Sequence, residues 1–162
     1  MDEVVLAVLA AELDADVRVM LEATDTAKER LGEGSVAAAE AAAYHLARAC
    51  NAAEATAIRV ARAFENTIAQ NGGWHANLLR RMTLAIPGVR PPLFDPAILD
   101  DLTELRAFRH TFRHAYDLRI RPERISELIP VAERAASRMR DAIGAFIASV
   151  ATMYGWPPVG SG

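Results

Sequence analysis

Cysteine, lysine and clustered metal-binding side chains are scarce in this chain of 162 residues. Cys50 is the single cysteine, so no disulfide can form within the chain, and cysteine and histidine do not cluster at the spacing of a zinc site. This usage favours a reduced, cytosolic setting. We therefore expect a cytoplasmic protein without a metal or other cofactor.

Long apolar runs and alternating patterns are also missing. The amino-terminal apolar run begins with acidic residues, where a secretory signal is basic, and it is soon interrupted by Glu12 and Asp14. The chain has no run of about 18 uncharged, apolar residues, which argues against a membrane-spanning helix. No segment alternates polar and apolar residues with a period of two, so we predict no strands.

Positive charge is limited and unevenly distributed. The formal net charge of −3 gives the whole chain no attraction to nucleic acid or membranes. The basic residues are nearly all arginine, with Lys28 the single lysine. Residues 104–124 contain six Arg and three acidic residues, so this segment carries +3 and the rest of the chain −6. A basic segment in an acidic chain indicates a local site for an anion.

Apolar residues recur at helical spacing through most of the chain, separated by Gly and Pro. These signals predict five helices, over residues 2–31, 36–70, 74–85, 96–118 and 122–154. The last should kink at Pro130. Short connections favour antiparallel neighbours. We predict an all-α, up-and-down bundle of about five helices, with a single helical domain over residues 1–155 and a short tail over 156–162.

The fourth predicted helix carries the most informative segment, LRAFRHTFRHAYDLRIR at residues 105–121. At about 100° per residue, its polar side chains fall on one arc of less than half the helix circumference, which we predict to be the outer face of the helix. Its Phe and Leu side chains form the inner face. The polar arc consists of Arg106, Arg109, His110, Arg113, His114 and Tyr116. Exposed helix faces usually mix charges of both signs. We predict that this polar arc binds a negative charge.

The order of residues on this arc resembles a known signature. The segment from Arg109 to His114 has the order Arg, polar residue, three further residues and His, which resembles the motif of the HEPN superfamily. The His-x-Tyr extension to Tyr116 resembles the HepT branch of bacterial toxins within that superfamily. The all-helical pattern, the Trp74-His75 pair after a glycine break and the PGVRPP loop are also similar to HepT-like ribonuclease domains. The resemblance covers most of the chain.

The resemblance implies a metal-independent endoribonuclease toxin of a type VII-like toxin–antitoxin system. It implies that Arg and His from two protomers meet at a homodimer interface, and that a nucleotidyltransferase antitoxin silences the toxin by attaching AMP to the Tyr. Carried over to this chain, Arg109 and His114 are the catalytic pair and Tyr116 is the modification target. His110 stands where relatives often have Asn or another polar residue, so a catalytic and an orienting role both stay open.

The chemistry of RNA cleavage without metal agrees with these residue types. The reaction needs a group that moves the 2′-hydroxyl proton and a cation that stabilises the charge developing on the phosphate. Histidine titrates near neutral pH, and arginine binds phosphoryl oxygens. We therefore predict that His114 transfers the proton and Arg109 binds the phosphate, leaving a 2′,3′-cyclic phosphate end. Arg106 and Arg113 are candidates for contacts with the RNA backbone.

Each assignment has a structural alternative. Arg109 and His114 could instead be side chains satisfied within a helix interface. Arg106 and Arg113 could be surface arginines that pair with Asp101, Glu104 or Asp117. Tyr116 could pack with its hydroxyl at the edge of the core. The whole chain could be a non-catalytic HEPN-like module that binds a nucleotidyltransferase partner or a nucleotide. Both functions share the same bundle, so the fold does not separate them.

Overall fold

The structure is a computed structural model in which residues 2–65, 74–114 and 120–156 are described, residues 74–76 and 114 by their backbone alone. The elements in these ranges are helices: α1 (Glu3–Gly32), α2 (Val36–Glu65), α3 (Trp74–Arg81), α4 (Pro96–His114) and α5 (Pro122–Tyr154). Their order and type confirm the predicted all-α bundle. The described ends of α2 and α4 precede residues 66–73 and 115–119, so the predicted continuations of these helices lie outside the described residues.

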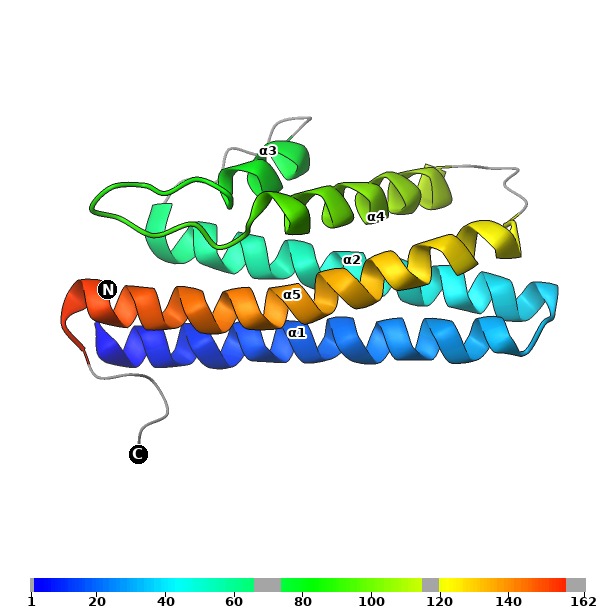
Figure 1. The fold of residues 1–162 in the computed structure, drawn as a ribbon, viewed down its shortest axis with the longest axis horizontal. Coiled ribbons are helices and arrows are strands. Elements are labelled where there is room, and N and C mark those ends of the chain that lie inside the picture. Colours follow the sequence, from blue (N-terminus) through cyan, green and yellow to red (C-terminus); the bar gives the residue numbers. More distant parts are fainter. Residues whose placement is uncertain (1, 66–73, 115–119, 157–162) are drawn as a thin grey trace.

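The middle of the bundle is formed by α2 and α5. α1 packs against both of them on one side, and α4 packs against both on the other. α1 and α2 run in opposite directions, as do α4 and α5, while the short α3 contacts α2 and α4 (Figure 1). This is the predicted up-and-down arrangement. Within the ranges described, no helix is both long and apolar enough to span a membrane.

Two helix starts follow directly from local sequence. The Ser35 hydroxyl accepts a hydrogen bond from the amide of Ala38 at 3.1 Å at the start of α2. The Asp95 carboxylate accepts one from the amide of Ile98 at 2.7 Å, with Pro96 as the first residue of α4. Ser and Asp are preferred N-caps, and proline at the first helical position loses no hydrogen bond. The sequence signals for both starts are therefore confirmed.

Close packing in the bundle depends on small side chains from α2. Its inward side is mostly alanine, including Ala42, Ala43, Ala49, Ala53 and Ala57, none of them more than 1% exposed. Alanine combines high helix propensity with a small side chain, so backbones approach closely. Cys50 is part of this buried side, and burial raises the pKa of its thiol to about 12. It is therefore a core residue without thiolate reactivity.

Two features of the later helices concern proline. α5 continues from Pro122 to Tyr154 through Pro130, and Figure 1 shows that its course bends in the first half. α3 ends at Arg81, four residues before the predicted end. The carbonyl of Met82 accepts hydrogen bonds from the amides of Leu93 and Phe94, at 2.8 and 3.1 Å. The proline-rich loop therefore makes the hydrogen bonds that a further turn of α3 would have made.

That loop is held by a buried arginine. Arg90 is 1% exposed, and its Nη2 donates to the Glu65 carboxylate at 2.6 Å and to the Arg81 carbonyl at 3.1 Å. Its Nη1 donates to the carbonyls of Leu84 and Pro91, both at 3.1 Å. Buried charges are paired and hydrogen-bonded because desolvation is costly. Arg90 therefore joins the end of α2 to the loop that leads into α4.

Candidate active site

Arg109, in the last turns of α4, has its guanidinium directed toward α2. Nη1 lies 2.7 Å from Oε2 of Glu54, and Nη2 lies 2.6 Å from Oε1 of the same carboxylate. Nη1 also donates to Oδ1 of Asn51 at 2.5 Å. The side chains of Arg109 and Glu54 are 11% and 6% exposed. A bidentate pair of this kind fixes both the position and the plane of the guanidinium.

The inward direction of Arg109 corrects the predicted polar arc. Ile98, Leu102 and Leu105 are buried, and Arg109 follows Leu105 by four residues. These steps of four, three and four residues mark one side of a helix. Arg109 therefore continues the buried stripe of α4, and the prediction that it lies on an outer face was wrong.

Glu54 is a residue of the site that sequence reasoning missed. It lies on α2 among the alanines Ala52, Ala53 and Ala57, and it is buried. Acidic side chains are rarely buried unless they are paired. A single carboxylate within the alanine-rich inward side of α2 was therefore the available signal that a buried cation faces it. Asn51, one turn earlier on α2, extends the same contact to Arg109.

His114 is the final residue of α4. It follows Arg109 by five positions, which corresponds to a rise of about 7.5 Å along the helix axis. The structure describes the backbone of His114 and not its side chain, and Tyr116 lies outside the described residues. The two proposed catalytic positions therefore share the end of one helix.

The remaining predicted site residues lie around this helix end. His110 and Arg113 are exposed, and Arg106 is half-buried. Within the described ranges, no ion pair engages Arg106 or Arg113. Two of the acidic residues considered as alternative partners pair with other arginines. Glu104 pairs with Arg124 at 3.0 Å, and Asp101 pairs with Arg134 and Arg138 of α5. The third alternative partner, Asp117, lies outside the described residues.

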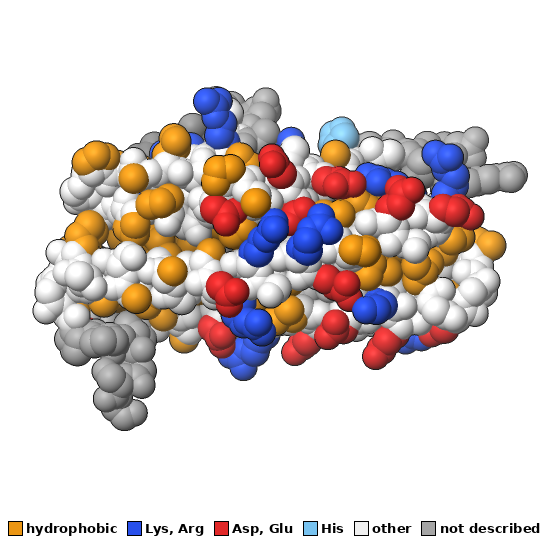
Figure 2. All heavy atoms as spheres, in the orientation of Figure 1, with side chains coloured by type: hydrophobic (Ala, Val, Ile, Leu, Met, Phe, Trp, Pro, Cys, Tyr) orange, Lys and Arg blue, Asp and Glu red, His pale blue; other side chains and the backbone are white. Residues whose placement is uncertain are grey.

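Ion pairs cover the seam between α4 and α5. Asp101 of α4 is nearly buried and accepts from Arg134 at 2.8 Å and from Arg138 at 3.2 Å, both on α5. On the far side of α5, Lys28 pairs with Glu133 at 2.7 Å. Figure 2 shows that acidic and basic side chains alternate over the middle of this face. This face is electrostatically mixed, so it does not extend the basic character of the end of α4.

A further histidine, His45, belongs to α2 and not to α4. His45 on α2 is half-buried, and burial, followed by the nearby charges of Arg48 and Arg30, lowers the pKa of its imidazole below 6.5. Its ring lies edge-on to Tyr44 with centroids 5.4 Å apart. Across the part of the chain that the structure describes, no group of three His, Cys, Asp or Glu side chains could hold a metal ion.

A comparison with known protein families finds a match that includes α4 and its partner α2. A family model described as HepT-like protein covers residues 41–150, from α2 into α5. The chain belongs to the HepT-like family. This confirms the resemblance to the HEPN superfamily and identifies a HEPN toxin-type module in a family generally related to nucleases. No curated protein and no solved structure matches the chain.

Proposed function

We propose that this HepT-like protein is a metal-independent endoribonuclease toxin in which Arg109 and His114 form the catalytic pair. The observation that carries the proposal is the fixed guanidinium of Arg109, held by Glu54 and Asn51 at the same helix end as His114. A buried ion pair adds little stability compared with well-packed apolar side chains. Its presence beside a candidate proton-transfer group therefore supports a chemical role.

In this mechanism His114 accepts the proton of the RNA 2′-hydroxyl. The 2′-oxygen then attacks phosphorus, the bond from phosphorus to the 5′-oxygen breaks, and an acid protonates that leaving oxygen. The products are a 2′,3′-cyclic phosphate and a 5′-hydroxyl. The Arg109 N–H groups on Nε and Nη2 that Glu54 and Asn51 do not use remain to bind phosphoryl oxygens. Because its orientation is already fixed, Arg109 stabilises developing charge without reorganisation.

We place the complete site at a homodimer interface. One protomer supplies His114 as base and the second supplies its copy as acid, so the two proton transfers of the reaction have separate groups. The guanidinium of Arg109 from one protomer then meets His114 from the other. Arg106, Arg113 and His110 surround this helix end and supply further contacts to the RNA. The protein acts on cytoplasmic RNA under this proposal.

A second function is favoured by one specific observation. The side chain of Arg109 is only 11% exposed, and its charge is already balanced by Glu54. Those facts also suit a structural arginine in a non-catalytic module that binds a nucleotidyltransferase or a nucleotide. In that case the pair holds α4 against α2 and makes no contact with RNA.

Incubation of the purified protein with total RNA tests the two functions against each other. The wild-type protein should produce fragments with 2′,3′-cyclic phosphate ends, which a cyclic-phosphate-specific ligation reaction detects. The Arg109→Ala/His114→Ala protein, prepared in parallel, should leave the RNA intact. Wild-type protein that leaves RNA uncut, or a double variant that cuts it equally well, would contradict the nuclease and favour the binding module.

The proposal includes a nucleotidyltransferase antitoxin that attaches AMP to Tyr116, two residues after His114 in the sequence. An AMP group there adds bulk and negative charge beside arginines that RNA would use. Mass spectrometry after co-expression with the partner should find AMP on Tyr116 and none on a Tyr116→Phe protein. AMP on exposed Tyr44 or Tyr154 in the wild-type protein would refute the proposed site.

A further inference from the structure

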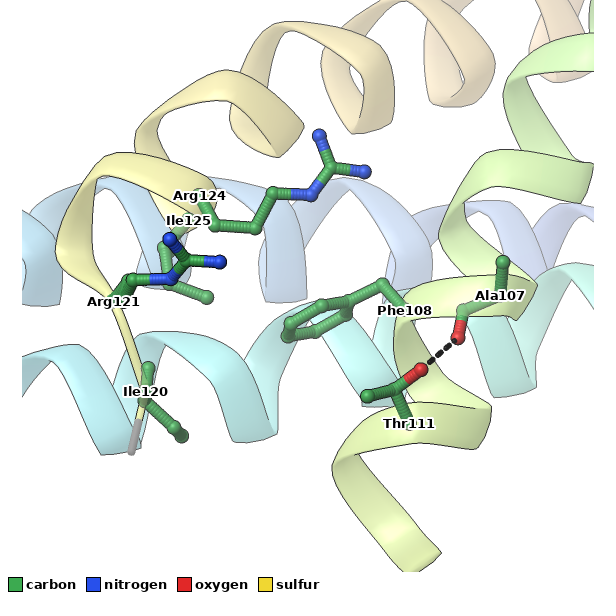
Figure 3. A pocket seen from close by; sticks show the side chains of 7 residues that line it. All are labelled: Ala107, Phe108, Thr111, Ile120, Arg121, Arg124 and Ile125. Atoms are coloured by element: carbon green, nitrogen blue, oxygen red, sulfur yellow. Dashed lines mark hydrogen bonds between the residues drawn. The ribbon is translucent and has the colours of Figure 1, made fainter. Parts of the chain in front are cut away.

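A pocket of about 250 Å³ lies between the end of α4 and the start of α5 (Figure 3). Six of its lining residues are Ala107, Phe108, Thr111, Ile120, Arg121 and Ile125. Ligand pockets for drug-sized molecules are typically about 300–1,000 Å³. A pocket slightly below this range has room for a single ring system and not for an extended ligand.

The walls of the pocket suit a flat ring. Phe108 is half-buried, and Figure 3 shows its side chain pointing from α4 into the space in front of Ile120 and Ile125. Ile125 is fully buried and belongs to the core, so this wall is rigid. Thr111 adds little polarity, because its hydroxyl already donates to the Ala107 carbonyl at 3.1 Å. An aromatic face opposite aliphatic side chains is a stacking surface for a nucleobase.

Two arginines, Arg121 and Arg124, line the pocket. Arg124 lines it, but its guanidinium already pairs with Glu104 at 3.0 Å and Glu127 at 2.9 Å. Arg121 is exposed, and no ion pair engages it within the described ranges. Arg121 therefore supplies a cation next to an apolar, aromatic floor. This combination matches a planar base joined to a phosphate.

The pocket also lies on the side of α4 that leads to His114. Ala107 and Thr111 precede position 114 by seven and three residues, and this spacing keeps the three positions on one side of a helix. Arg109 and Glu54 lie toward α2, on another side of α4. A base held in the pocket would thus be adjacent to the end of α4 without competing for the Arg109–Glu54 contact.

We propose that this pocket binds one base of a single-stranded RNA substrate, stacked on Phe108 with its phosphate near Arg121. The inference rests on the proposed function, because it assigns a subsite of the same RNA. It predicts recognition of an unpaired nucleotide, since a base within a duplex cannot enter the pocket.

Binding of a short single-stranded RNA with 2′-O-methyl riboses tests this subsite separately from catalysis, because the methyl group blocks the attacking oxygen. Fluorescence anisotropy should show about tenfold weaker binding for Phe108→Leu, the expected size of one lost base stack. Arg121→Gln should also weaken binding, and more so at low salt. Uridine 5′-monophosphate should compete with the oligonucleotide for the wild-type protein.

Two matched variants control for the loss of an aromatic ring or an arginine elsewhere. Phe64→Leu removes a half-buried ring that contacts Phe146, and Arg140→Gln removes an exposed arginine of α5. Both should bind the oligonucleotide as the wild-type protein does. If Phe108→Leu fails to fold by circular dichroism, the exposed Arg121→Gln protein decides the question alone.

The outcomes separate the subsite from the nuclease. Normal oligonucleotide binding by both Phe108→Leu and Arg121→Gln overturns the subsite, even where wild-type protein cleaves RNA. Absence of oligonucleotide binding by the wild-type protein overturns it as well. Weakened binding by the two pocket variants, with no RNA cleavage by the wild-type protein, supports the subsite while the proposed nuclease fails. If the two pocket variants weaken binding of a protein partner and bind the oligonucleotide normally, the RNA subsite is overturned as well.

Discussion

The His114→Ala protein should cleave RNA about 10²–10⁴-fold more slowly than the wild-type protein, the usual contribution of a general acid–base group. The loss should appear in the rate of the bond-breaking step, because alanine removes the group that moves the 2′-hydroxyl proton. Single-turnover cleavage of a labelled single-stranded RNA measures this step directly. Binding of the 2′-O-methyl oligonucleotide should change much less than the rate.

His45→Gln is the matched control for the loss of an imidazole. His45 lies on α2, half-buried beside Tyr44 and within 3.5 Å of an Arg48 nitrogen, and no step of the mechanism uses it. Its variant should cleave RNA at the wild-type rate. A His114→Ala protein that retains the wild-type rate, with His45→Gln unchanged, would remove His114 from the mechanism.

The Glu54→Ala protein should lose about 3–5 kcal/mol of unfolding free energy, because the substitution leaves the charge of Arg109 buried without its counterion. Chemical denaturation followed by circular dichroism measures the loss. RNA cleavage should fall as well, since alanine no longer fixes the plane of the guanidinium. Both effects originate in one pair of side chains, so they should appear together.

An exposed ion pair provides the comparison for Glu54. Asp14 pairs with Arg18 at 3.0 Å on the surface of α1, where both side chains are more than half exposed. Asp14→Ala should lower the free energy of unfolding by no more than about 1 kcal/mol.

The double variant Glu54→Leu/Arg109→Met should recover much of the stability that Glu54→Ala loses, because it replaces the buried ion pair by apolar side chains. If Glu54→Ala costs no more than Asp14→Ala, the contact with Arg109 is not the buried pair described above.

Local sequence predicted the parts of the fold that depend on local chemistry. Ser35 and the Asp95-Pro96 pair mark helix starts by capping, and that chemistry needs no distant contact. The apolar side chains predicted for the inner face of the fourth helix, Leu105, Phe108 and Phe112, likewise pack in or against the core. These signals were sufficient for the order of the helices and for the all-α bundle.

The direction of Arg109 depends on distant residues, and this is why the polar-arc prediction failed for it. Arg109 lies at the border between the apolar and polar sides of α4, so helical periodicity alone allows either direction. Its partner Glu54 is 55 residues earlier in the chain, and the packing of α4 on α2 brings them together. Arg90 is buried for a similar reason, because Glu65 lies 25 residues before it.

The most direct measurement mixes two inactive proteins in one dimer. Arg109→Ala and His114→Ala chains, co-expressed with different affinity tags and purified through both, give a mixed dimer with one intact Arg109 and one intact His114 on different protomers. The account predicts that this mixed dimer cleaves RNA faster than either variant alone, because it keeps one Arg109–His114 couple. It should still be slower than the wild-type protein, because it lacks the second His114. A mixed dimer as inactive as its parents would contradict a site in which Arg109 of one protomer meets His114 of the other.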